Sequence, residues 1–281
     1  MPSAKRNLLT LCSIAAVVCA LVAAAGMHHA LTDNYDAAIR HFAVNAPGAL
    51  VAACLSIAGI LTGCAAALLL RKEKTATTPA SGAFTTFASV VTAFMMLAVF
   101  MMSVRAFSGA EILPQIKVVL TALAAVYFFL IPSDKMADNE VLPFVSMLPA
   151  LYAVVSMLAV YFDKTYAMNS PVKIYDLAMY AAMALFFVAE ARCALRIPRP
   201  ASYAFCGIAC TVMCTVNGAS HFLVALHDTV GHGFSLVESA VWLCVALYAL
   251  SRLFDFGKAA VEDKAKAEGK SDTSEEATHA E

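Results

Sequence analysis

Charged residues are scarce in this sequence, and neither sign of charge dominates. Asp, Glu, Lys and Arg make up 14% of the 281 residues, whereas a soluble domain carries about 25%. The formal net charge is −1, so the chain lacks the basic excess with which proteins bind nucleic acid. Hydrophobic residues make up 61% of the chain, and this leaves no room for a soluble catalytic domain.

The sequence also lacks the short motifs of several enzyme classes. It contains no Walker loop, no HExxH zinc motif, no CxxC pair and no glycine-rich dinucleotide fingerprint, which are the motifs that hold phosphates, metals and nucleotides. No apolar segment has a lysine near its centre, and this argues against a retinal Schiff base. These absences point away from an enzyme, and we predict no cofactor.

Nine cysteines are present, but their positions do not indicate a disulfide framework. Eight of them lie inside apolar segments, and Cys193 lies at the end of one. A cysteine in such a segment behaves as a small, weakly polar packing residue. We therefore interpret the cysteines as packing residues rather than as bridges or metal ligands.

Eight long apolar segments occupy the chain from residue 7 to residue 256. In lipid, a segment of this length must satisfy its own backbone hydrogen bonds as a helix. The sequence therefore predicts an all-α fold, a polytopic transmembrane bundle of about eight helices within residues 1–256. The expected helices are 7–26, 48–70, 84–104, 115–131, 141–162, 172–194, 202–226 and 233–256. Residues 257–281 carry alternating charges and are predicted to lead from a helical extension into a disordered cytoplasmic tail.

The distribution of basic residues predicts that both termini lie in the cytoplasm. With this orientation, 14 of the 19 lysines and arginines fall on the cytoplasmic side, as the positive-inside rule requires. The fourth segment is the least certain span, because Lys117 leaves only residues 118–131 uninterrupted. We expect the Lys117 side chain to reach along the helix to the membrane interface.

The first apolar segment has two interpretations. Its basic start, MPSAKRN, and the small residues of VAAAGM are typical of a signal peptide. Its apolar run is longer than the core of about 7–15 residues that signal peptides have. We favour a retained helix, whereas cleavage would leave seven helices in the same orientation.

Ionisable side chains inside the predicted helices are few, and they are the first candidates for a functional site. His221 and Glu238 are equally distant from the middle of the short connection between the last two helices, so we expect them at the same depth. Asp176 lies about one turn into a helix that enters from the same side, and Asn217 shares a helical face with His221. The sequence therefore predicts one outward-facing polar pocket lined by Asp176, Asn217, His221 and Glu238.

Two interpretations of this pocket remain open. Histidine changes its charge near neutral pH, so a contact between His221 and Glu238 would form a proton- or cation-responsive site. The alternative is an interhelical hydrogen bond that fastens the last two helices to each other.

Six of the seven histidines fall on the predicted outer side of the membrane. Histidine and carboxylate side chains suit zinc, copper or nickel, and His28, His227 and His232 are the candidate ligands. Their spacing matches no metal motif. We therefore interpret these side chains as solvated loop histidines and predict no metal site.

Residues 162–200, FDKTYAMNSPVKIYDLAMYAAMALFFVAEARCALRIPRP, carry an ordered set of features. MNSP is followed by a lysine, an apolar helix, EAR and a basic PRP loop. In these features, over about residues 160–225, the chain resembles a family of uncharacterised polytopic membrane proteins from anaerobic Gram-positive bacteria. The resemblance implies a multi-pass protein of the bacterial cytoplasmic membrane, and it implies no activity.

The sequence favours the movement of a small solute or ion across the membrane, because the bundle carries polar groups and no soluble domain. An alternative is a non-transporting membrane sensor or scaffold that contacts a partner through its inner loops or tail. A second alternative is an outward-facing metal- or haem-binding redox protein. The expected partners are the lipid bilayer and a small solute or ion, and nucleic acid is not among them.

Overall fold

The computed structural model of the 281-residue chain describes the backbone of most residues. The described ranges are 3–36, 41–42, 46–72, 81–105, 112–132, 141–165, 169–195, 197, 199–227 and 234–278, without the side chains of residues 3 and 259–278.

Eight helices are long and apolar enough to cross a membrane, which confirms the predicted helical membrane fold. One crossing is divided into two helices, α5 and α6. The helices are α1 (Ser3–Asp33), α2 (Pro47–Leu70), α3 (Ala83–Val104), α4 (Ile112–Leu130), α5 (Leu142–Ser146), α6 (Leu148–Phe162), α7 (Pro171–Ala194), α8 (Pro200–His227) and α9 (Leu236–Thr278).

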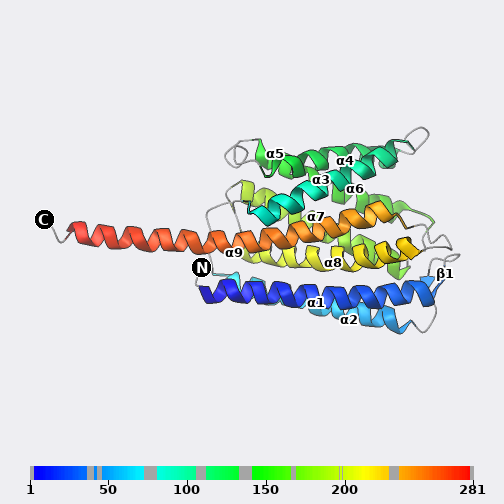
Figure 1. Ribbon diagram of the computed structural model, residues 1–281, viewed down its shortest axis with the longest axis horizontal. Coiled ribbons are helices and arrows are strands. Elements are labelled where there is room, and N and C mark those ends of the chain that lie inside the picture. The colour runs from blue at the N-terminus through cyan, green and yellow to red at the C-terminus, as the bar shows by residue number, and fades with distance from the viewer. Residues whose placement is uncertain are drawn as a thin grey trace.

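A short antiparallel hairpin stands between α1 and α2. It consists of β1 (Tyr35–Asp36) and β2 (His41–Phe42), in which Tyr35 pairs with Phe42 and Asp36 with His41. Figure 1 shows this hairpin at one end of the bundle and the N-terminus at the other. We call these ends the hairpin end and the terminal end.

The structure corrects the boundary of the first helix. We expected a loop from residue 27, but α1 continues to Asp33, so His28 and His29 lie on helical turns. Buried residues of α1, such as Met27, Ala30 and Leu31, continue the packed face into these turns. Tertiary packing therefore extends the helix past its uniformly apolar part.

A proline explains the division between α5 and α6. Met147 separates the two helices, and Pro149 occupies the second position of α6. Proline has no backbone N–H, and its ring clashes with the carbonyl four residues earlier, so the helical ladder is interrupted there.

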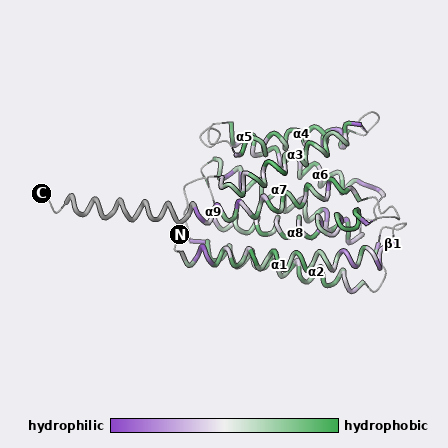
Figure 2. The backbone as a smooth tube through the Cα atoms, viewed as in Figure 1, coloured by the Kyte–Doolittle hydropathy of each residue, from purple (hydrophilic) through white to green (hydrophobic). Residues whose placement is uncertain are grey.

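The helix α8 lies at the centre of the bundle and packs against α1, α2, α7 and α9. Most of its apolar window is buried, whereas only about a third of each window is buried in α1 to α6. Figure 1 shows α1 and α2 along one edge of the bundle and α3 to α6 along the other. Hydrophobic residues extend along the whole bundle (Figure 2), and the exposed apolar side chains of the outer helices imply contact with lipid.

The helix α9 is longer than the membrane requires. Its membrane-spanning part ends near Lys258, and its backbone stays helical to Thr278, beyond the bundle (Figure 1). The helix thus includes the helical extension that we predicted after residue 256, and it continues through most of the segment predicted to lead into a tail. Alanine, lysine and glutamate are frequent in this segment, and these residues favour a helix. The cytoplasmic location of the tail stays a prediction.

The first turn of α3 is capped by a side chain from α9. A carboxylate oxygen of Asp255 accepts hydrogen bonds from the backbone N–H of Gly82 at 2.8 Å and from the hydroxyl of Thr85 at 2.6 Å. The N–H groups of a first helical turn have no partner within their own helix. Asp255 therefore satisfies α3 and fixes its position against α9.

Helices α1 and α2 approach each other closely at two glycines. A Cβ atom on Gly48 would lie 2.4 Å from the carbonyl oxygen of Gly26, and a Cβ on Gly26 would lie 2.9 Å from the carbonyl oxygen of Gly48. Close approach at small residues is a common source of helix association in membranes.

We expect Gly48→Ala to lower the free energy of unfolding by about 1–3 kcal/mol, because its methyl group must displace backbone atoms of α1. Gly257→Ala is the matched control: its Cβ meets Arg6 at an ordinary 3.5 Å, and alanine favours the helix by up to about 1 kcal/mol. Unfolding by SDS in mixed micelles measures both variants. Equal stability of Gly48→Ala and the parent chain would contradict the close approach of α1 and α2.

Candidate functional site

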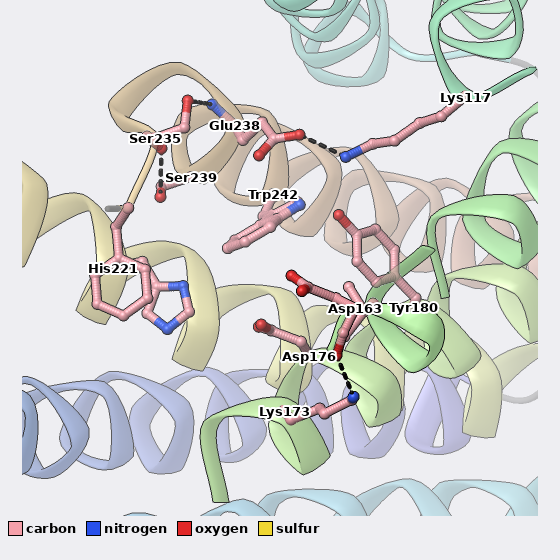
Figure 3. A pocket seen from close by; sticks show the side chains of 12 residues that line it. Lys117, Asp163, Lys173, Asp176, Tyr180, His221, Ser235, Glu238, Ser239 and Trp242 are labelled. Atoms are coloured by element: carbon pink, nitrogen blue, oxygen red, sulfur yellow. Dashed lines mark hydrogen bonds and ion pairs between the residues drawn. The ribbon is translucent and has the colours of Figure 1, made fainter. Parts of the chain in front are cut away.

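A polar cavity of about 150 Å³ lies within the bundle near the hairpin end. Side chains from four helices, α4, α7, α8 and α9, and from the end of α6 meet around it (Figure 3). Its lining consists of Lys117, Val160, Asp163, Lys173, Asp176, Tyr180, His221, Phe234, Ser235, Glu238, Ser239 and Trp242. Three of the four residues predicted to form a pocket, Asp176, His221 and Glu238, are in this set.

A wider groove of about 860 Å³ adjoins the cavity between α4 and α6. The two spaces share Lys117, Val160 and Asp163 as lining residues. The groove therefore provides an approach to the cavity from the hairpin end.

The carboxylate of Glu238 is paired with Lys117. Lys117 Nζ on α4 lies 2.7 Å from Oε1 of Glu238 on α9, and both side chains are about a quarter to a third exposed. Ser235 starts α9 by accepting a hydrogen bond from the backbone N–H of Glu238 at 3.3 Å, so the carboxylate is available to the lysine. The sequence had placed Lys117 at the membrane interface, but its ammonium group turns into the bundle.

The predicted contact between His221 and Glu238 is wrong. The imidazole ring of His221 stacks on Phe234, with ring centroids 4.1 Å apart and an interplanar angle of 15°. The Lys117 ammonium forms a charge-assisted hydrogen bond with Glu238, which is stronger than a bond from a neutral imidazole. His221 is only 3% exposed, and its Nδ1 atom has no hydrogen-bond partner among the described residues.

Asp176 and Asn217 lie together on facing helices, α7 and α8. The Asn217 amide donates to the backbone carbonyl of Tyr175 at 2.9 Å and lies 3.5 Å from Oδ1 of Asp176. Within the described ranges, no cationic side chain lies within ion-pair distance of Asp176. The Asp176 carboxylate therefore faces the cavity without a charged partner.

Lys173 was missed as a cavity residue. Its side chain is 1% exposed, and its Nζ donates to the backbone carbonyl of Asp163 at 2.9 Å. The only sequence signal was its position within the first turn of an apolar helix. The pairing of Lys117 was missed as well. Its signal was a position at the depth of Glu238, which carries the opposite charge.

Aromatic rings form one wall of the cavity. Trp242 meets Tyr180 edge to face, with ring centroids 6.1 Å apart, and lies 5.5 Å from the ring of His221. Trp242 is the single tryptophan of the chain, so its fluorescence reports on this cavity alone.

A packed layer closes the bundle between the cavity and the terminal end. Edge-to-face ring contacts join Tyr127, Phe128, Phe187 and Tyr248, and the hydroxyl groups of Tyr127 and Tyr248 are 3.0 Å apart. All four side chains are fully buried.

A buried ion pair lies between this layer and the terminal end. Arg252 of α9 donates from Nε to Oε1 of Glu190 at 2.9 Å and from Nη2 to Oε2 at 3.1 Å. Tyr203 of α8 donates its hydroxyl to the same carboxylate. Both charged side chains are no more than 3% exposed, so the pair fastens α7, α8 and α9 together at the terminal end.

Cysteines and polar residues share one face of α8. Cys206, Cys210 and Cys214 are buried, and the sulfur atoms of the last two are 3.9 Å apart. These cysteines form a helix-packing seam, as expected. Asn217 and His221 continue the same face to the cavity.

The candidate metal ligands are not gathered into a site by the part of the chain that the structure describes. No group of three or more His, Cys, Asp or Glu side chains there is placed to hold a metal ion. His28 lies within α1, His227 ends α8, and His232 lies outside the described residues. His29 contacts Asp33 one turn further along α1, with 2.5 Å between Nδ1 and Oδ2.

No family model, no curated protein and no solved structure matches this chain. Conclusions about function therefore rest on the geometry of the cavity.

We expect Arg252→Met to lower the free energy of unfolding by about 3–5 kcal/mol, because it leaves the Glu190 carboxylate buried without its counter-charge. Arg105→Met, at the exposed end of α3, should change stability by less than about 0.5 kcal/mol. The SDS unfolding midpoint and slope of each purified variant give these values. A loss as small as that of the control would show that the pair does not hold the terminal end together.

Proposed function

We propose that this protein moves a small polar solute or ion across the bacterial cytoplasmic membrane and that the cavity is its binding site. The observation that carries the proposal is a cavity at membrane depth whose charged lining residues come from separate helices. Charged side chains inside a membrane bundle are costly and are characteristic of substrate and ion pathways. The hairpin end is assigned to the outside because the basic residues favour a cytoplasmic terminal end.

The two ends of the bundle differ in a way that supports transport. The cavity adjoins a groove at the hairpin end, whereas rings and the Glu190–Arg252 pair fill the bundle toward the terminal end. In a transporter this arrangement corresponds to a state that is open to the outside and closed to the inside.

The helix α9 connects the two ends of this pathway. Glu238 and Arg252 are separated by about 21 Å along the helix, and each pairs with a different partner helix, α4 or α7. A movement of α9 relative to α4 and α7 would change both ion pairs together. We propose this movement as the step that exposes the cavity to the opposite side.

A sensor is the second candidate, and one observation favours it. The helix that carries Glu238 continues without a break to Thr278, so the segment beyond Lys258 reaches about 30 Å past the spanning part. A ligand in the cavity would then act on a partner through this segment. The redox alternative has no comparable support in the described residues.

Uptake by proteoliposomes that contain the full-length protein tests transport. Labelled amines, amino acids, carboxylates, sugars and alkali cations are offered in turn. For the solute that is taken up, we expect Asp176→Asn to reduce the initial rate at least about tenfold, because a hydrogen bond to a charged group contributes roughly 1.5–3 kcal/mol.

Asp33→Asn is the matched control, because it makes the same chemical change at an exposed carboxylate of the same end. A chain that ends at Lys258 separates the two candidate functions: a transporter retains its uptake, whereas a sensor shows no uptake in either form. Uptake by Asp176→Asn at the rate of the parent chain would show that the cavity is not part of the transport pathway.

A further inference from the structure

We propose that the cavity recognises a small protonated amine, an organic ammonium ion that retains N–H groups. This inference rests on the proposed function, because it names the chemical class of the solute. It is derived from the charge balance, the hydrogen-bonding atoms, the rings and the size of the cavity.

The charge balance of the cavity favours a cation. Three carboxylates line it, Asp163, Asp176 and Glu238, together with two ammonium groups, Lys117 and Lys173. With histidine counted as neutral, the formal charge of the lining is negative. Glu238 and Lys117 offset each other at 2.7 Å, and Lys173 donates to the Asp163 carbonyl at 2.9 Å. Asp176 is therefore the carboxylate that would form an ion pair with a cationic ligand.

The hydrogen-bonding atoms favour a cation with N–H donors. The Asp176 carboxylate accepts hydrogen bonds, and the Asn217 amide approaches its Oδ1 atom at 3.5 Å. On the neighbouring helix, Nδ1 of His221 is buried and has no protein partner among the described residues, and a neutral imidazole offers a lone pair on one ring nitrogen. Figure 3 shows Asp176 and His221 on the same side of the cavity. A primary ammonium group has enough N–H bonds to donate to both.

The rings accept the organic part of such a ligand. Trp242, Tyr180 and Phe234 contribute aromatic surface to the cavity, and a cation over an aromatic face is attracted by the ring quadrupole. A cavity of about 150 Å³ admits a molecule the size of benzene. The cavity therefore has room for a short alkyl or aryl amine.

Other ligand classes fit these features less well. An anion would meet the Asp176 carboxylate, and both lysines already have acceptors, which leaves the uncharged Nε1–H of Trp242 as a buried donor without a partner in the described structure. A quaternary ammonium ion has no N–H for Asp176 or His221. A zinc ion is held by three or four protein ligands, and the described residues do not gather three His, Cys, Asp or Glu side chains around one point.

Titration of the purified full-length protein with n-butylamine tests the proposal. This amine is protonated at pH 7 and has fewer non-hydrogen atoms than benzene. Excitation at the red edge of the protein spectrum selects Trp242, the single tryptophan. We expect a saturable change in its emission with n-butylamine, and at least about tenfold weaker half-saturation with tetramethylammonium and with sodium butyrate. Sodium chloride at equal ionic strength supplies the baseline.

Two variants test the acceptors separately. Asp176→Asn should raise the half-saturation concentration of n-butylamine at least about tenfold, because it removes the charge at nearly the same shape. His221→Phe keeps a ring against Phe234 and removes both ring nitrogens, one of which is an acceptor, and it should raise the concentration about threefold to tenfold. Asp33→Asn should leave it unchanged. If Asp176→Asn fails to fold, the selectivity of the parent chain and the His221→Phe variant still decide the result.

Three results would overturn the inference: butyrate or tetramethylammonium binding as tightly as n-butylamine, no saturable change with the amine, or unaltered amine binding in both cavity variants. Different results would reject the proposed transport function. Amine binding without amine uptake in proteoliposomes supports the ligand class and rejects transport. Uptake of a different solute without amine binding supports transport and rejects the ligand class.

Discussion

The charged side chains of α9 need partners inside an apolar bundle, and this requirement fixes the helices around the cavity. Glu238 is paired with Lys117 of α4, Arg252 with Glu190 of α7, and Asp255 caps the start of α3. An unpaired charge in a medium of low dielectric constant is costly, so each partner helix must lie against α9 at a defined height. The positions of the aromatic wall and of Asp176 follow from this arrangement.

The polar groups are divided unequally between the two halves of the bundle. Toward the terminal end, Glu190, Arg252 and Tyr203 satisfy one another and are packed against rings. Toward the hairpin end, Asp176 faces the cavity without a counter-charge, and Nδ1 of His221 has no protein partner in the described structure. The satisfied cluster stabilises the fold, whereas the incomplete one has the properties of a binding site. The proposed transport function and ligand class both follow from this difference.

Several details of the site could be predicted because they depend on helix geometry alone. Counting residues from the connection between α8 and α9 placed His221 and Glu238 at one depth, and both line the same cavity. Their direct contact was predicted wrongly, because residue counting gives depth and not the identity of the nearest group on a third helix. Lys117 comes from α4, far away in the sequence, and its full charge makes it the better partner for Glu238.

The sequence by itself determined that the chain forms eight membrane-spanning helices, since long apolar segments in lipid must satisfy their own backbone hydrogen bonds. It also placed Asp176, His221 and Glu238 at similar depth near one end of the bundle, and all three line the cavity. Only the tertiary structure decided how the charges pair, that α1 extends through His28 and His29, and that Asp176 has no counter-charge among the described residues. Pairing depends on the rotation and neighbours of each helix, and these are set by side-chain packing between segments distant in the sequence.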